Sequence, residues 1–224
     1  MGKLKGLALL ALPLTAVPAP VMAETPLERQ VLETLNHART DPVAYAETLR
    51  KYRSFFRANI VSLPGEPADF ETAEGVAVVD DAIAFLGRQA AMAPLASAPV
   101  LEASSADLVR EQATSGDTGH DGGDGSSPGD RVRRRGGGAF VAEVIAYGAV
   151  DAVDVVRQLI VDDGVADRGH RTILYDPHLR FAGVSCGAHP EYRTMCVIDL
   201  AVTPDGQSVP TRVVRAELPV RNGH

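Results

Sequence analysis

The chain has 224 residues, with 29 acidic against 22 basic side chains, and its formal net charge of −7 has the wrong sign for a protein that binds nucleic-acid phosphates. Its length fits an export signal followed by one globular domain. No apolar stretch is long enough to span a bilayer, so we expect no stable membrane anchor. The acidic balance does permit binding of a cation.

The first residues predict an export signal. Two lysines precede the apolar run Leu7–Leu14, and Val21-Met22-Ala23 offers small or apolar residues before a cleavage point. Cleavage after Ala23 leaves a signal peptide of residues 1–23, with Ala19 as the alternative cleavage point. We therefore expect a mature protein that is secreted or periplasmic.

Helical periodicity dominates the first half of the mature chain. Apolar residues recur at three- and four-residue steps, which predicts buried helix faces. The expected helices cover 27–52 with a break at Pro42, 80–92 and 104–115. Ser104 or Ser105 is the expected cap of the last of these. The turn-rich stretch 53–78 is expected to be a loop or an insertion.

The second half alternates loops with apolar segments. A glycine-rich loop (116–129), an arginine-rich stretch (130–138), an apolar segment (140–147) and an amphipathic helix (151–163) follow one another, and strand-like runs at 181–186 and 194–202 form a hairpin. Helices around a hairpin predict an α+β domain with an antiparallel sheet, over residues 24–203. Residues 204–224 are expected to be a polar C-terminal tail.

The arginine-rich stretch contains Arg131, Arg133, Arg134 and Arg135. We expect these side chains to lie in a solvated loop and to offset nearby acids. The alternative is that they dock an anionic polymer of the cell envelope.

The two cysteines, Cys186 and Cys196, lie on either side of a turn around Glu191. Because they are symmetric about Glu191, they would face each other across the hairpin, and an oxidising compartment permits a disulfide. The alternatives are two buried thiols or a metal pair, although no third or fourth thiolate is present to complete a zinc site.

Two histidines, each preceded by glycine, are the candidate working residues. His120 lies in the glycine-rich loop and His170 follows the amphipathic helix. Each alone has an ordinary reading as an exposed histidine. Glu143 changes this reading, because a carboxylate in an apolar run must face water or find a partner. Imidazoles are natural partners, directly or through a metal.

Three segments around these residues resemble, in the same order, the main motifs of the CAP superfamily, also called the SCP domain. They are His120 followed by Asp124-Gly125-Ser126-Ser127-Pro128-Gly129-Asp130-Arg131, then Ala142-Glu143-Val144-Ile145-Ala146-Tyr147-Gly148, and Gly169-His170-Arg171-Thr172-Ile173-Leu174. The family includes cysteine-rich secretory, pathogenesis-related and venom-allergen proteins and many bacterial secreted proteins. The resemblance covers residues 27 to 202.

The resemblance implies an α-β-α sandwich with a small antiparallel sheet and a central groove. Two histidines and two acids line that groove in the family, and in several members they hold a divalent cation such as zinc. By motif match His120, Glu143 and His170 take three of these positions. The fourth falls on Asp162, with Asp163 as its rival.

The chain also departs from the family pattern. The usual Glu-Asn is Glu143-Val144, Leu159 replaces a common aromatic residue, and the connection 162–169 is longer than usual. These departures leave both histidines in place, but they affect the residues that would complete the coordination of a cation.

The resemblance further implies an exported binding protein for a divalent cation, with zinc favoured, and for an extracellular or envelope ligand (a lipid, sterol, glycan or protein). No organic cofactor is expected. One alternative is a metal-assisted hydrolase with Glu143 as general base beside His120 and His170. Another is a non-catalytic structural domain whose histidines only order the groove.

Overall fold

The computed structural model describes residues 26–209, so the expected signal peptide and most of the expected tail lie outside the described residues. The chain begins with α1 (Pro26–Thr40) and α2 (Pro42–Arg53). The Asp41 carboxylate caps α2 by accepting a hydrogen bond from the Ala44 N–H, and Pro42 needs no partner in the first turn. The predicted helical break at Pro42 is confirmed.

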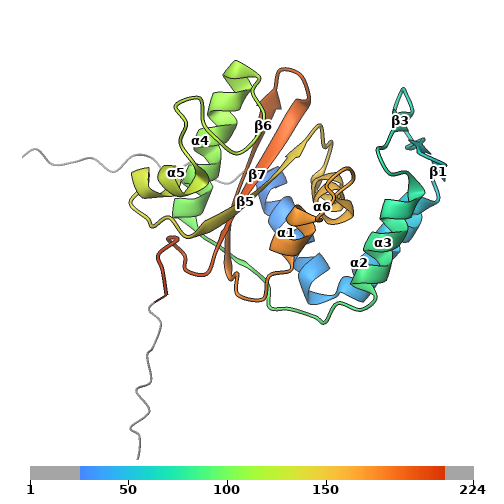
Figure 1. Ribbon diagram of the computed structural model, residues 1–224, viewed down its shortest axis with the longest axis horizontal. Coiled ribbons are helices and arrows are strands. Elements are labelled where there is room, and N and C mark those ends of the chain that lie inside the picture. Colours follow the sequence, from blue (N-terminus) through green and yellow to red (C-terminus); the bar gives the residue numbers. More distant parts are fainter. Residues whose placement is uncertain (1–25, 210–224) are drawn as a thin grey trace, which may run out of the picture.

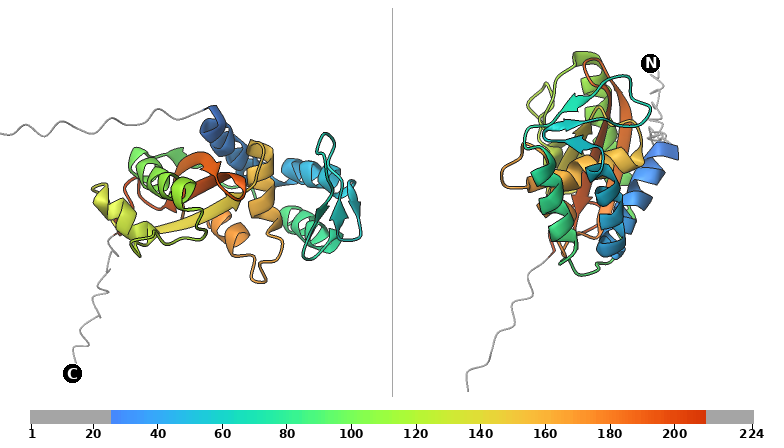
Figure 2. Two further views of the ribbon diagram at one scale, coloured as in Figure 1. Left: turned by 90° about the horizontal axis from the view of Figure 1, so that it is seen from above. Right: turned by 90° about the vertical axis from the view of Figure 1, so that its right-hand side faces the viewer.

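The turn-rich stretch after α2 forms a small sheet, where the sequence suggested a loop or an insertion. Its strands β1 (Phe56–Arg57), β2 (Ile60–Val61) and β3 (Phe70–Glu71) pair antiparallel in the order β1-β2-β3. We call residues 54–75 the arm. The arm lies beyond α2 and α3, at the opposite end of the molecule from α5 (Figures 1 and 2).

Two predicted helices have wrong boundaries. The helix predicted at 80–92 is α3 (Val76–Leu86), which starts earlier and ends well before Pro94. The helix predicted at 104–115 is α4 (Pro99–Ser115), which starts earlier and follows the short strand β4 (Ala96–Ser97). Pro99 starts α4 because its fixed φ suits a first turn. The expected caps Ser104 and Ser105 are therefore buried inside α4, where the Ser105 hydroxyl donates to the Gly183 carbonyl.

A four-stranded sheet forms the centre of the molecule. Its strand order is β4-β6-β7-β5, where β5 covers Val141–Tyr147, β6 Phe181–His189 and β7 Arg193–Ala201. The three long strands are antiparallel, as expected, while the short β4 pairs parallel with β6. Cys186 and Cys196 are direct partners in the β6–β7 register and form a disulfide, which confirms the predicted pairing.

Helices cover both faces of this sheet. One face packs on α4 through a cluster that includes Leu108, Ile145 and Val197. The other face packs on α1 and α6 (Ala152–Val161), and Val144 and Ile198 belong to that larger core. The arrangement is the helix–sheet–helix sandwich that the family resemblance implied, with α2, α3 and the arm as a further layer (Figure 1).

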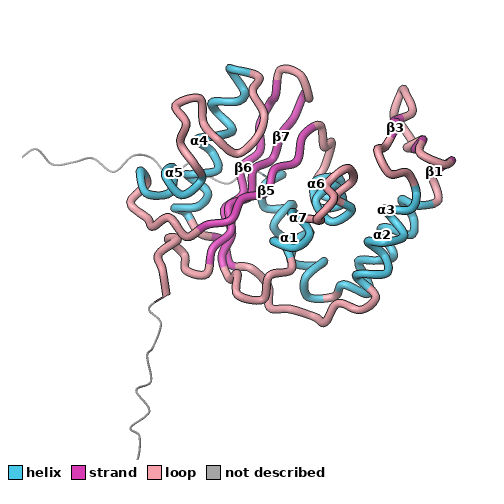
Figure 3. The backbone as a smooth tube through the Cα atoms, in the orientation of Figure 1, coloured by secondary structure: helices cyan, strands magenta, loops and turns pink. Residues whose placement is uncertain are grey.

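Two short helices complete the fold. The helix α5 (Pro128–Arg134) begins with a capping box between Ser127 and Asp130, and α7 (Gly169–Leu174) follows the connection after α6. Long loops connect α4 to α5 and α5 to β5 (Figure 3). No helix among residues 26–209 is long and apolar enough to cross a membrane.

Candidate functional site

His120 and Glu143 form the first pair of the site. Glu143 lies on β5, and its carboxylate accepts a hydrogen bond of 2.9 Å from Nδ1 of His120 in the glycine-rich loop. The Glu143 side chain is only 1% exposed, whereas that of His120 is 48% exposed. The hydrogen bond to Glu143 raises the pKa of His120, while burial lowers it. The sequence argument that Glu143 needs a partner is confirmed.

Arg131 is the second partner of Glu143, and the expectation that it lies in a solvated loop is wrong. Its guanidinium is 1% exposed and forms an ion pair with the other Glu143 oxygen. It also donates to the carbonyls of His120 and Ser126, at 2.8 and 3.1 Å. Because helix α5 begins at Pro128, Arg131 points inward at the first turn, toward the glycine-rich loop.

The other arginines of the cluster fit the sequence expectation better. Arg133, Arg134 and Arg135 form ion pairs with Asp130, Asp124 and Asp107, mostly at exposed positions. They therefore offset nearby acids, although they stand on or beside a helix.

Asp199 is a buried acid that the sequence analysis missed. It lies on β7 directly opposite Glu143 and is fully buried. Burial, followed by the charge of Glu143, raises the pKa of Asp199 well above its ordinary value. The signal that singled out Glu143 also applies here, because Asp199 interrupts the apolar run of residues 194–202.

His170 and Asp162 form the second pair. Nδ1 of His170 lies 2.6 Å from one Asp162 oxygen, and the other oxygen accepts from the backbone N–H groups of His170 and Arg171, at 2.9 and 3.2 Å. Asp162 ends α6 with a φ of +60°, a conformation that aspartate tolerates better than most residues. This turn brings its buried carboxylate back onto the start of α7.

Asp163, the rival for this position, has a different role. Its carboxylate accepts from the backbone N–H groups of Ala73 and Glu74 at the end of the arm, at 2.7 and 2.9 Å. The two neighbouring acids thus separate into one that orients His170 and one that holds the arm.

The four sequence-predicted residues therefore form two separate histidine–carboxylate pairs. Among residues 26–209, no group of three or more His, Cys, Asp or Glu side chains is arranged to hold a metal ion. Both oxygens of Glu143 and both of Asp162 already accept hydrogen bonds. These carboxylates therefore suit the position behind a ligand, where they fix the ring and its tautomer.

The imidazoles do suit a cation such as zinc. With Nδ1 bound to a carboxylate, each neutral ring presents the lone pair of Nε2, the usual form of a ligating histidine. Neither Nε2 makes a hydrogen bond within the part of the chain that the structure describes. The donor set is thus two imidazole nitrogens, each backed by a carboxylate.

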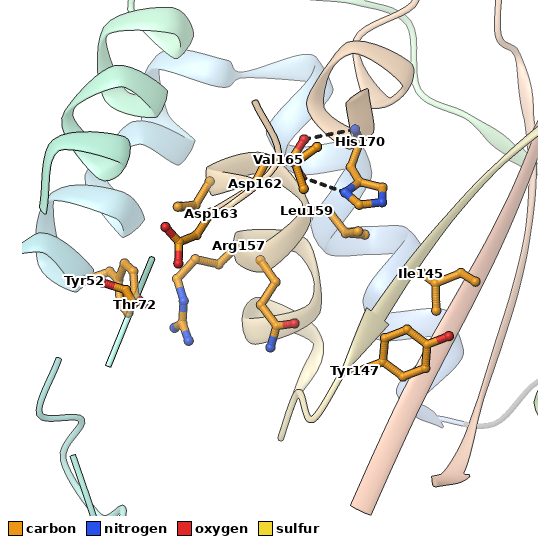
Figure 4. Close-up of a pocket in the computed structure, with 12 residues that line it drawn as sticks. Tyr52, Thr72, Ile145, Tyr147, Arg157, Leu159, Asp162, Asp163, Val165 and His170 are labelled. Atoms are coloured by element: carbon orange, nitrogen blue, oxygen red, sulfur yellow. Dashed lines mark hydrogen bonds and ion pairs between the residues drawn. The ribbon is translucent and has the colours of Figure 1, made fainter. Parts of the chain in front are cut away.

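A groove lies beside the second pair. It has a volume of about 360 Å³ and runs between the β5 edge and α6, with His170, Ile145 and Tyr147 on one side (Figure 4). Arg157 of α6 and Thr72 of the arm lie across the groove from Ile145 and Tyr147 (Figure 4), and Gln158 of α6 also lines it. His120 is not among the described residues that line it. The Tyr147 hydroxyl is held away by Gln112 and by the Gly119 N–H.

One of three comparisons with known proteins identifies the family of this chain. A family model described as CAP, the cysteine-rich secretory protein family, matches residues 32–200. No curated protein matches the chain. Among solved structures, the chain is similar to an extracellular protein containing a SCP domain from Bacillus anthracis str. Ames, with 18% identity and a TM-score of 0.41. That match covers 49% of this chain and 34% of the other, or about a third of the Bacillus protein.

Proposed function

Because the chain belongs to the cysteine-rich secretory protein (CAP) family, we propose that it is an exported binding protein. In this proposal His120 and His170 take a divalent cation such as zinc, and the groove beside β5 takes an extracellular or envelope ligand. The predicted signal peptide of residues 1–23 supports export, which N-terminal sequencing of the exported protein would test.

One observation carries the cation proposal. Each histidine is partly exposed, and each has its Nδ1 fixed by a buried carboxylate, which leaves Nε2 as the ligand atom. The side chains of Glu143 and Asp162 are both 1% exposed, so they orient the rings from behind. A bound cation would supply a positive charge and a Lewis acid at the protein surface.

The geometry favours binding over hydrolysis. A hydrolase of the expected kind needs Glu143 as a general base within reach of water. The Glu143 carboxylate is instead 1% exposed and is held by His120 and Arg131, so a proton transfer to it would disrupt a buried ion pair. Retention of a ligand without turnover is therefore the expected behaviour.

Elemental analysis of the purified protein, together with calorimetric titration with zinc, tests the cation site. We expect wild-type protein to bind zinc, and His120→Ala and His170→Ala each to weaken binding strongly. His178→Ala is the matched control, because that histidine is 81% exposed and pairs with an exposed aspartate. Absence of both wild-type signals would overturn the cation proposal. If both histidine variants still bind zinc as the wild-type protein does, the zinc site does not include these histidines.

A further inference from the structure

We propose that the groove beside β5 binds an extended peptide segment of a partner protein, which adds to the sheet as a strand next to β5. This inference names the ligand class for the binding function proposed above, and it rests on that function but not on the cation. Strand addition needs a free sheet edge, an opposite wall that holds the peptide, and side-chain chemistry that suits it.

The free edge is β5 itself. β5 is the last strand in the order β4-β6-β7-β5, so β7 is its one partner in this sheet. The Gly148 N–H donates to the Thr194 carbonyl at 2.8 Å, and this bond shows which β5 residues are hydrogen-bonded to β7. Hydrogen-bonded positions alternate along such a pair, so Ala146 faces β7 while Ile145 and Tyr147 direct their N–H and C=O groups outward.

These outward peptide groups belong to the two β5 residues that line the groove. The backbone N–H and C=O groups of Ile145 and Tyr147 make no hydrogen bond to another element among residues 26–209. An unpaired row of alternating donors and acceptors is the template that an extended peptide completes. Lipid chains offer no donors to this row, and sugar hydroxyls do not repeat at the spacing of a strand.

The opposite wall of the groove consists of α6 and the arm. Hydrogen bonds and an ion pair connect the end of the arm to the segment that follows α6. Glu74 at the end of the arm pairs with Arg168 at 2.6 Å and accepts from the Gly164 N–H at 2.9 Å. The Asp163 carboxylate holds the same segment through two backbone N–H groups. The arm and the connection 162–169, which is longer than is usual in the family, thus meet in space, and residues of both line the groove.

The groove continues past Tyr147 into a second hollow of about 270 Å³. Tyr52, Thr72, Tyr147, Arg157 and Gln158 line both hollows. Glu66 of the arm and Arg193 of β7 line the outer one, and within the described residues neither has an ion-pair partner. One free charge of each sign, among apolar and aromatic groups, complements a peptide with mixed side chains better than it complements an acyl chain or a neutral glycan.

An array of short unstructured peptides of mixed sequence, probed with the mature protein in the presence of a chelator, tests the proposal. The strongest peptides would then be measured by calorimetry, and by amide hydrogen exchange followed by NMR. We expect saturable binding, with new protection of the Ile145 and Tyr147 amides. Binding of peptides without that protection would overturn strand addition. Selective binding of chitin or peptidoglycan oligosaccharides, or of fatty acids, in place of peptides would overturn the ligand class.

Substitutions in the opposite wall supply the second measurement. Gln158→Trp fills the groove from α6 and should weaken peptide binding by roughly tenfold or more. Thr72→Trp does so from the arm and serves if the first variant folds poorly. Gln89→Trp, beyond the end of α3, is the matched control and should bind as wild type. Equal binding by folded Gln158→Trp, Thr72→Trp and wild-type protein would overturn the proposal. Because a chelator is present, the outcome is independent of the zinc titration.

Discussion

Glu143 on β5 and Asp199 on β7 lie directly opposite each other in the sheet register, and both are buried. Arg131 forms an ion pair with Glu143 and supplies one positive charge to this region. Two ionised carboxylates beside one guanidinium would leave a buried negative charge without compensation, which is costly. The pKa of Asp199 is accordingly raised, first by burial and then by the charge of Glu143, so the folded state favours the protonated form of Asp199.

This assignment predicts the sign of a pH dependence. In the unfolded chain Asp199 ionises near its ordinary pKa, whereas in the folded state it keeps its proton to a higher pH. The folded state then binds more protons, so Asp199 lowers the free energy of unfolding as pH rises from that ordinary value toward its raised folded pKa, by up to about 1.4 kcal/mol per pH unit. Asp199→Asn should remove this slope and increase stability at neutral pH. Urea unfolding of both proteins across a pH series measures it; a slope unchanged by the substitution would contradict the assignment.

Arg131 is expected to be essential for the stability of the first pair. Arg131→Met leaves the buried Glu143 charge without its ion-pair partner and should cost about 3–5 kcal/mol, the usual range for breaking a buried pair. Combining Arg131→Met with Glu143→Gln removes the unpaired charge as well. The double variant should therefore be more stable than Arg131→Met alone, and urea unfolding of the complete cycle tests this. Purely additive losses would mean that the two side chains are not coupled.

The sequence predicted the parts of this site that depend on local pattern. The apolar run around Glu143 predicted a carboxylate that needs water or a partner, and the symmetry of Cys186 and Cys196 about the turn favoured a disulfide between them. Arg131 could not be placed in this way. An arginine in a cluster of four is ordinarily solvated, and only helix α5, seven residues long, turns this one inward. Its burial depends on long-range packing between that helix and β5.

The separation of the four candidate residues into two pairs has the same kind of origin. The spacing of His120, Glu143, Asp162 and His170 contains no information about which histidine meets which acid. The strand register and the left-handed turn at Asp162 decide it. The arm was expected as a loop or an insertion because its strands are two residues long, too short for a recognisable alternation.

His120 should titrate above its ordinary pKa of 6.5, because its ring N–H donates to Glu143. A raised folded pKa means that protonated His120 contributes stability below the unfolded pKa, and that this contribution is lost as pH rises through the folded pKa. The contribution is modest because the side chain is half exposed. NMR titration of the imidazole resonances should show the pKa falling in Glu143→Gln, with His178 as the internal reference. A His120 titration that Glu143→Gln leaves unchanged would show that the pair does not persist in solution.

The disulfide between Cys186 and Cys196 should contribute to stability. It closes a loop across the β6–β7 turn, and a link of this loop size restricts the unfolded chain by about 2–3 kcal/mol. Reductant should therefore lower the urea midpoint of the wild-type protein. The double variant Cys186→Ala/Cys196→Ala provides the control, since its midpoint should not respond to reductant. If reductant shifts both proteins equally, the effect has another source.

The neighbouring acids Asp162 and Asp163 should have separable effects. Asp162→Ala removes the acceptor of the His170 ring and of two backbone N–H groups at the start of α7, and it places alanine in a left-handed conformation that aspartate tolerates better. We expect it to disorder the His170 ring and to weaken zinc binding. Asp163→Ala instead releases the backbone of Ala73 and Glu74.

Hydrogen exchange read by mass spectrometry, beside zinc titration, distinguishes the two roles. Asp163→Ala should speed exchange in the end of the arm, around residues 72–75, by removing the acceptors of two backbone N–H groups, while zinc affinity stays near that of wild type. Asp162→Ala should do the reverse, with faster exchange at the start of α7 and weaker zinc binding. Should the two variants give the same exchange pattern, the assignment of one acid to His170 and the other to the arm would be wrong.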